Sequence, residues 1–154
     1  GMCLRDRLIV APNEAAPLTP VIEKAMDEVI PVVLIDRKIT SNKYTAFVGA
    51  DNFQIGKEVG VYASQLLNGK GNIVEIRGLK GSTPDLERHN GFVNSLSHFP
   101  EIKIVYESDG AWLRSEANKR MSEALNKVQS IDLVFAHNDE MAIGVYEAFN
   151  VVIT

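Results

Sequence analysis

Polar and aromatic side chains stand just after the ends of short apolar runs, or in the first turns of the helix that follows. They are Asp36, Arg37, Arg88, Trp112 and Asn138. Open parallel sheets place their ligands at such positions, outside the carboxyl ends of the strands. Carboxylate, guanidinium and amide groups exchange hydrogen bonds with vicinal hydroxyls, and a flat indole covers the apolar face of a sugar ring. Together these residue types predict a binding site for a neutral sugar.

Each of these residues also has a purely structural interpretation. Asp36 and Arg37 could form a local surface ion pair, and Arg88 could be a solvated helix residue. Trp112 could be a core aromatic, and Asn138 could do no more than cap a helix. Taken singly, the residues leave these alternatives open, and only the set as a whole favours the sugar site.

Motifs of catalysis and of metal or cofactor binding are not evident. The histidines, His89, His98 and His137, show neither the H-E-x-x-H spacing nor a cluster with cysteine. No serine lies in a G-x-S-x-G elbow, and 78–82 is not a complete phosphate-binding loop. No two carboxylates are credibly placed around a glycosidic bond. We therefore predict a binding protein, not an enzyme, with no metal and no cofactor.

The elements that must position these residues alternate along the chain. Short runs rich in β-branched residues predict strands, and most are continuously apolar, as in parallel sheets covered on both faces. Stretches of helical period separate them, so the pattern predicts βαβ units in a three-layer α/β/α fold with a parallel sheet. The expected strands are Leu8–Ala11, Val32–Ile35, Ala46–Gly49, Asn72–Ile76, Lys103–Tyr106 and Asp132–Ala136.

Capping residues predict where the helices begin. Asp51 and Asn138 are good N-caps, and Thr-Pro pairs at 19–20 and 83–84 are typical of a cap followed by the first helical residue. The apolar stripe from Leu113 to Val128 predicts a further amphipathic helix. One helix end breaks the rule, because Val29 stands where a glycine would normally supply the positive φ of the C-cap.

Composition and charge exclude several classes of protein. The chain has 154 residues with 45% hydrophobic residues, which is long enough for one sizeable core. Its formal net charge is −4 and it has no basic block, so we expect no nucleic-acid partner. No apolar run approaches the roughly 18 residues of a membrane span. The single cysteine, Cys3, excludes an internal disulfide.

Longer motifs resemble a known family. The segments 33–37, 48–52, 86–92 and 137–144 are similar, in order and spacing, to the type I periplasmic sugar-binding proteins of the ribose-binding-like group. The string Asn138-Asp139-Glu140-Met141-Ala142 is quite specific to that superfamily. The resemblance covers nearly the whole chain and implies a periplasmic location and a sugar held in a cleft between two lobes.

The resemblance also implies roles for single residues. In that family the Asp-Arg pair after the strand binds the sugar from the first lobe, which Asp36 and Arg37 match. The arginine of the E-R-x-x-G-F helix reaches the sugar from the second lobe, as Arg88 would here. Trp112 matches the aromatic residue that stacks on the ring, and Asn138 matches a further hydroxyl contact. The loop after the first strand makes Asn13 a weaker candidate.

The subgroup and the extent of the domain follow from the same resemblance. The loop 11–20 is similar to periplasmic sensor domains of hybrid two-component systems from Bacteroides-type bacteria, in which a histidine kinase lies in the same polypeptide. The chain is expected to be a fragment, with part of the first lobe in 1–50 and most of the second in 51–154. Any membrane association is expected only through absent parts, and exposed edges predict self-association into a homo-oligomer.

Three alternatives remain beside the sensor. The chain could belong to the binding component of a sugar ABC importer, or to the effector domain of a LacI-type repressor, which shares the fold. It could also be an enzyme with a similar open sheet that uses Asp36 or Asp139 as a base, although no nucleophile or phosphate cradle accompanies these carboxylates.

Overall fold

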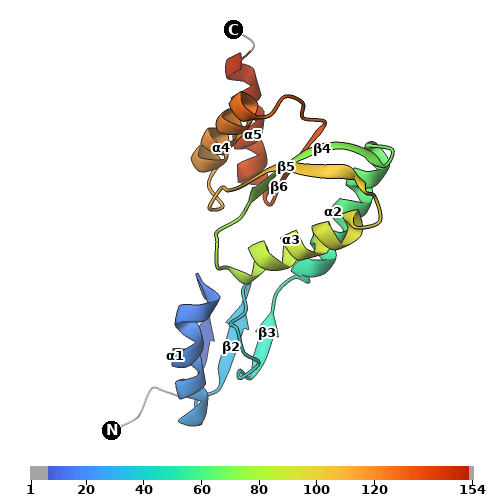
Figure 1. The fold of residues 1–154 in the computed structure, drawn as a ribbon. Coiled ribbons are helices and arrows are strands. Elements are labelled where there is room, and N and C mark those ends of the chain that lie inside the picture. Colours follow the sequence, from blue (N-terminus) through green and yellow to red (C-terminus); the bar gives the residue numbers. More distant parts are fainter. Residues whose placement is uncertain (1–6, 153–154) are drawn as a thin grey trace. The chain divides into compact units, whose positions relative to one another are not determined.

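Strands and helices alternate along the chain as expected, except that the strands within 32–48 follow each other without a helix (Figure 1). The computed structural model describes residues 7–152. Within that range, none of the helices combines the length and the apolar character of a membrane span. The elements are β1 (Leu8–Val10), α1 (Ala15–Asp27), β2 (Val32–Ile35), β3 (Ala46–Val48), α2 (Asn52–Leu66), β4 (Lys70–Arg77), α3 (Thr83–Leu96), β5 (Glu101–Asp109), α4 (Arg114–Lys127), β6 (Leu133–Ala136) and α5 (Asp139–Val152).

The chain divides into two compact units. The first runs up to Asp51 and includes Gly81–Pro84, and the second comprises Asn52–Lys80 and the chain from Asp85 onward. Each unit has its own parallel sheet of three strands, in the order β1-β2-β3 in the first and β5-β4-β6 in the second. The predicted fold class, parallel sheets flanked by helices, is therefore confirmed.

The core of the first unit lies between α1 and one face of its sheet. Ile22 of α1 packs with Val32 and Leu34 of β2 and with Ile39. Burial alternates along β2, because successive side chains of a strand point to opposite faces of the sheet. That second face carries exposed apolar side chains, with Ile9 70% exposed.

The start of α1 corrects one expectation. Thr19 and Pro20 were predicted to open this helix, but it begins at Ala15, one turn earlier. The Thr19 hydroxyl donates to the Ala15 carbonyl oxygen at 2.8 Å and lies 2.9 Å from the Thr40 hydroxyl, so it serves the helix interior and the core. Pro20 supplies no N–H to the Ala16 carbonyl, which is the normal cost of a proline inside a helix.

The end of α1 confirms the predicted strain at Val29. The Val29 N–H donates to the Met26 carbonyl at 3.1 Å, and the Ile30 N–H donates to the Ala25 carbonyl at 3.0 Å. This pair of bonds is a Schellman motif, which requires a left-handed residue after the C-cap. Val29 adopts φ 61°, a conformation that is costly for a β-branched side chain.

Replacing Val29 with glycine is expected to stabilise the protein by about 1 kcal/mol, because glycine adopts a positive φ without a Cβ clash. The Val29 side chain is 87% exposed, so little packing is lost. Urea unfolding followed by circular dichroism measures the change. Val21→Gly on the same helix, also exposed, is the matched control and should destabilise by about 0.5 kcal/mol. Equal destabilisation by both substitutions would refute strain at Val29.

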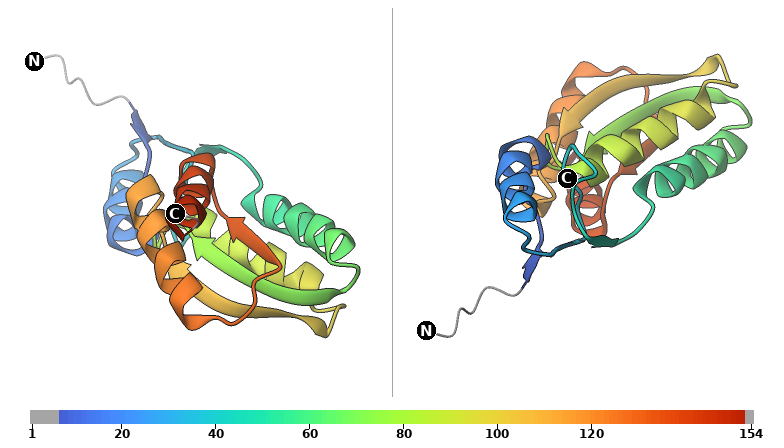
Figure 2. Two further views of the ribbon diagram at one scale, coloured as in Figure 1. Left: turned by 90° about the horizontal axis from the view of Figure 1, so that it is seen from above. Right: turned by 90° about the horizontal axis from the view of Figure 1, so that it is seen from below.

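The second unit has three layers (Figure 2). On one face of the sheet, α4 and α5 bury Val74 and Ile76 of β4 against Met121 and Met141. On the other face, α2 and α3 cover Ile73. Residues of β4 alternate between these two cores, and because both faces are covered the strand is buried from 73 to 76.

Strands β4 and β6 deliver their carboxyl ends to the same edge of this sheet. Parallel pairing places Ile76 of β4 beside Ala136 of β6, and Arg77 beside Asp109 of β5. The loops that leave these strands therefore start close together. They contain Gly78, the turn before α4 and the segment that begins α5, which is where the polar residues singled out in the sequence lie.

Candidate functional site

The predicted residues of the first unit meet one another. The Arg37 guanidinium donates from Nη1 to the main-chain oxygen of Asn13 at 2.8 Å and to its Oδ1 at 3.1 Å. Arg37 Nε lies 3.5 Å from Oδ2 of Asp36. The carboxylate of Asp36 is 74% exposed, so it is accessible to a ligand. Asn13, Asp36 and Arg37 thus form one polar cluster after β1 and β2.

Asp36 lies in a tight turn with an unusual backbone conformation. Asp36 has φ 64°, and the Arg37 N–H donates across it to the Ile35 carbonyl at 2.7 Å, which is the hydrogen bond of a γ-turn. The Asp36 N–H is held by the Val48 carbonyl of the neighbouring strand at 2.9 Å. Strain of this kind persists where the surrounding structure enforces it, and it is concentrated at functional sites.

The predicted residues of the second unit also come together. Arg88, on α3, donates from Nε to Oδ1 of the buried Asn52 at 2.9 Å and from Nη1 to the main-chain oxygen of His137. Its guanidinium lies 5.5 Å from the centre of the Trp112 ring, within the range of a cation–π contact. Two elements besides α3 therefore hold Arg88 in place.

A tight turn positions Trp112. Ala111 and Trp112 have φ 53° and 64°, and the Leu113 N–H donates to the Gly110 carbonyl at 2.8 Å, as in a type I′ turn. Neither residue is a glycine, so the turn is strained. The indole lies against Gly78, where an added Cβ would come within 2.0 Å of the ring. The indole of Trp112 therefore packs directly against the backbone of Gly78, and a larger residue there would displace it.

Asn138 combines capping with a place in the same cluster. Its Oδ1 accepts the Met141 N–H at 2.9 Å and so caps α5, as its position predicted. Its Nδ2 lies 3.4 Å from the main-chain oxygen of Trp112. The structural and the functional interpretations of this residue are therefore compatible, since the amide joins the start of α5 to the aromatic turn.

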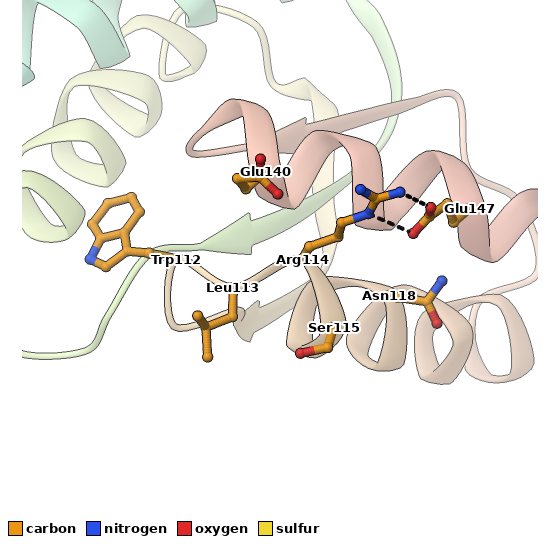
Figure 3. Close-up of a pocket in the computed structure, with 7 residues that line it drawn as sticks. All are labelled: Trp112, Leu113, Arg114, Ser115, Asn118, Glu140 and Glu147. Atoms are coloured by element: carbon orange, nitrogen blue, oxygen red, sulfur yellow. Dashed lines mark hydrogen bonds and ion pairs between the residues drawn. The ribbon is translucent and has the colours of Figure 1, made fainter.

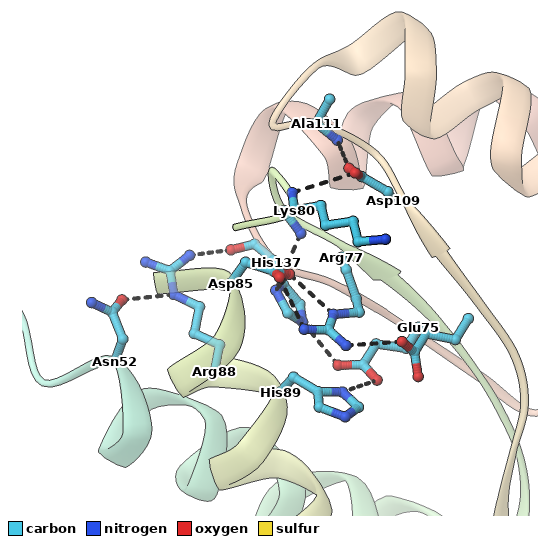
Figure 4. Close-up of polar contacts among 12 residues, drawn as sticks. Asn52, Glu75, Arg77, Lys80, Asp85, Arg88, His89, Asp109, Ala111 and His137 are labelled. Carbon is cyan, nitrogen blue, oxygen red and sulfur yellow. Dashed lines mark hydrogen bonds and ion pairs between the residues drawn. The ribbon is translucent and has the colours of Figure 1, made fainter. Parts of the chain in front are cut away.

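A buried charged cluster lies beneath these residues (Figure 4). The side chain of Glu75 is fully buried, and its two oxygens lie 2.9 Å from His137 Nε2 and 2.9 Å from His89 Nδ1. Burial by itself would raise the pKa of Glu75, but the hydrogen bond with His137 and the charge of His89 hold the pKa below its ordinary value. Glu75 is therefore a buried carboxylate.

Arg77 balances the acidic groups beside this cluster. It donates to both oxygens of Asp85, at 3.0 and 2.9 Å, and to Glu107 at 2.9 Å. Burial would lower the pKa of Arg77, but these hydrogen bonds raise it. Ligand atoms of Glu75, His89 and Glu107 lie within 4.8 Å of one another, as in a metal site. The guanidinium bound to Glu107 opposes a cation there, so we assign no metal to this group.

An open hollow lies beside the aromatic turn (Figure 3). Its volume is about 680 Å³ and it runs between the first turns of α4 and the side of α5. Arg114 and Glu147 dominate it, and they pair with each other through two hydrogen bonds. Because the two dominant charges of the hollow neutralise each other, we do not place the site in it.

Sequence reasoning missed the residues that support Arg88 and Trp112. Glu75 was assigned to an apolar strand, and His137 was considered only as a metal ligand. A signal existed, since a charged residue inside the run Ile73-Val74-Glu75-Ile76 must be paired if the strand is buried. No sequence pattern predicts the hydrogen bond between Asn52 and Arg88, because the two residues are far apart in the sequence.

Comparison with known proteins places this geometry in context. The sequence matches the family described as periplasmic binding protein domain over residues 6–151. The fructose-binding periplasmic domain of the hybrid two-component system BT1754 is 52% identical, with a TM-score of 0.93, over 96% of this chain and 49% of that chain. The galactofuranose-binding protein YtfQ of Escherichia coli K12 is 36% identical over 150 residues, which are 93% of this chain and 47% of that protein.

A third relative has the same extent. The ribose import binding protein RbsB of Bacillus subtilis 168 is 30% identical over 145 residues, covering 94% of this chain and 47% of that protein. The chain thus spans about half the length of the curated relatives it matches. These likenesses confirm the resemblance seen in the sequence motifs, including the similarity to a sensor domain.

Proposed function

The chain belongs to the periplasmic binding protein family, and from this premise we propose that it is part of a monosaccharide-binding sensor domain of a two-component signalling protein. The observation that carries the proposal is the convergence of Arg88, Trp112 and Asn138 after β4, β5 and β6. A guanidinium and an amide suit sugar hydroxyls, and the indole suits the apolar face of the ring. The similarity to a fructose-binding sensor domain supports the same assignment.

In this proposal the chain supplies parts of a periplasmic sugar-binding domain. Residues 1–50 are part of a first lobe and residues 51–154 are most of a second, with the sugar in a cleft between lobes. Asn13, Asp36 and Arg37 contact it from the first lobe. The strained turns at Asp36 and Trp112 support these roles, because backbone strain of this kind is concentrated at functional sites.

Arg88→Ala tests the sugar site. Ribose, fructose, xylose, arabinose, galactose and glucose are titrated into this chain and into the longest protein that contains it, with Trp112 fluorescence and thermal stability as readouts. We expect one sugar to saturate the longer protein, and Arg88→Ala to weaken it about ten- to a hundredfold, as for a lost hydrogen bond to a charged group.

Lys70→Ala is the control for this experiment. Lys70 is a cation on the same strand as the site but at its amino end, where it pairs with Glu101 at 3.2 Å. Its removal should leave the sugar affinity unchanged. If no sugar of the panel gives a saturable response, or if Lys70→Ala weakens binding as much as Arg88→Ala, the proposed site is wrong.

The alternative is the binding component of a sugar importer, which the likeness to a ribose import binding protein favours. Phosphorylation separates the two roles. A sensor should change the autophosphorylation of a kinase in the same polypeptide when the sugar is added. Sugar-dependent uptake by a partner permease, without such a kinase, would support the importer instead.

A further inference from the structure

Beneath the proposed sugar site, His137 joins two of the loops that carry it. Its side chain is fully buried and its Nε2 lies 2.9 Å from Oε1 of Glu75 on β4. Its Nδ1 accepts the N–H of Gly78 at 3.3 Å. Since Nδ1 acts as an acceptor, the ring is neutral with its proton on Nε2, which donates to Glu75.

The same residue supports the two groups that would touch the sugar. The main-chain oxygen of His137 accepts a hydrogen bond from Arg88 (Figure 4). Gly78, whose N–H donates to the imidazole, packs against the ring of Trp112. The Trp112 and His137 rings are 6.3 Å apart. A displacement of His137 would therefore change the positions of Arg88 and Trp112 together.

The carboxylate of Asp85 is a second hydrogen-bond acceptor near the imidazole of His137. Oδ1 of Asp85 lies 3.6 Å from His137 Nδ1, slightly beyond hydrogen-bond distance. If Nδ1 takes up a proton, it becomes a donor and can no longer accept the Gly78 N–H, so two donors face each other. The Asp85 carboxylate then attracts the protonated ring away from Gly78. The imidazole thus has two alternative partners, and protonation selects between them.

Other charged groups face this pair from each neighbouring element. From α3, His89 holds the second oxygen of Glu75. From β4, Arg77 holds Asp85 and also Glu107 of β5. On the β6 side the neighbour is the uncharged ring of Phe135, 4.7 Å from His137. His89 is therefore the other histidine of this cluster among the residues described, and it needs its own control.

We propose that His137 is a positioning residue for the sugar site, and that protonation of its imidazole loosens Arg88 and Trp112 and so lowers sugar affinity. The proposal rests on the proposed function, because it concerns the pH regulation of that same site. The site would therefore lose affinity when acidification protonates the ring.

The test compares His137→Gln with the unchanged protein in the longest chain that binds sugar. Glutamine carries a donor for Glu75 and an acceptor for the Gly78 N–H, but it takes up no proton in this range. The affinity of the unchanged protein is expected to fall about tenfold from about pH 7.5 to about pH 5. Whatever its affinity at about pH 7.5, His137→Gln should keep that affinity on acidification.

Two controls identify the titrating group. His89→Gln removes the other histidine bonded to Glu75, and it should keep the pH dependence of the unchanged protein. His137→Phe removes both hydrogen bonds, and it should bind weakly at both pH values. The proposal is overturned if His137→Gln retains the acid loss of affinity, if His89→Gln abolishes that loss, or if the unchanged protein shows none.

A sugar-free measurement keeps this test separate from the proposed function. Trp112 is the single tryptophan, so its emission reports directly on the aromatic turn. The emission should change with pH in the unchanged protein and not in His137→Gln, and nitrogen NMR should show the Nε2-protonated ring of His137 titrating in step. If both proteins give the same emission profile, or the ring does not titrate with it, the proposal fails whether or not a sugar binds.

Discussion

Replacing Glu75 with leucine is expected to lower the free energy of unfolding by about 3–5 kcal/mol. The substitution leaves the Nε2–H of His137 buried with no acceptor and removes the carboxylate that faces His89. An uncompensated polar group in a dry core costs its full desolvation free energy. Glu75→Gln retains an acceptor for His137 and loses only the charge, so it should cost about 1–2 kcal/mol.

Urea unfolding near neutral pH, followed by circular dichroism, measures these differences. Glu101→Leu is the matched control, since Glu101 is an exposed glutamate on the adjacent strand and is 66% exposed. It should change the free energy of unfolding by no more than about 0.5 kcal/mol. If Glu75→Leu is as mild as Glu101→Leu, the buried cluster does not stabilise the second unit.

The loss of stability at acid pH is a second test of the role of Glu75. Burial opposes the charge of Glu75, but hydrogen bonding with His137 and the charge of His89 lower its pKa in the folded state from the ordinary 4.5. Its carboxylate therefore contributes stability above about pH 4.5, and this contribution is lost as the pH falls through the lowered pKa. Glu75→Gln should lose that part of the pH dependence and keep the rest.

Gly56→Val is expected to destabilise the second unit by about 3 kcal/mol. A Cβ at Gly56 on α2 would come within 1.9 Å of the Arg88 carbonyl oxygen on α3. The reciprocal contact is equally close, since a Cβ at Gly91 would lie 2.0 Å from the Phe53 carbonyl oxygen. Main-chain atoms cannot give way as a flexible side chain can, so the two helices would have to separate.

The same substitution should disturb the proposed sugar site, because the displaced backbone is that of Arg88. Thermal unfolding checks the stability, and sugar titration checks the site. Gln65→Val adds a β-branched residue to an exposed position of α2 and controls for helix propensity, which should cost no more than about 0.7 kcal/mol. Equal effects of the two valines would contradict close packing of α2 on α3.

Elements that depend on local chemistry were predicted well. The strand at Val32–Ile35 has the predicted bounds, and the helix that Asn138 was expected to cap begins at Asp139. The strands β4 and β5 extend beyond the predicted 72–76 and 103–106, because polar residues at their ends join the ladder through the main chain. Thr19 and Pro20 misled, since a Thr-Pro pair is also tolerated inside a helix whose packing compensates the missing hydrogen bond.

For the candidate site, the sequence indicated the residues but not the contacts that hold them in place. Residue types and their places after strands were enough to select Asp36, Arg37, Arg88, Trp112 and Asn138. They could not reveal that Arg88 is held by Asn52 and by the His137 carbonyl, because these partners lie far from it in the sequence. The support of a ligand contact depends on which strands become neighbours, and hydropathy patterns do not contain that information.

By itself, the sequence determined the order of strands and helices, the parallel α/β class, the family and the strained end of α1. These follow from local periodicity, capping and motifs, which act over a few neighbouring residues. Only the tertiary structure decided that Glu75, His89 and His137 meet, that Trp112 rests on Gly78, and that Arg114 and Glu147 neutralise each other. Those contacts arise because parallel pairing brings the ends of β4, β5 and β6 to one edge, where burial forces every charge to find a partner.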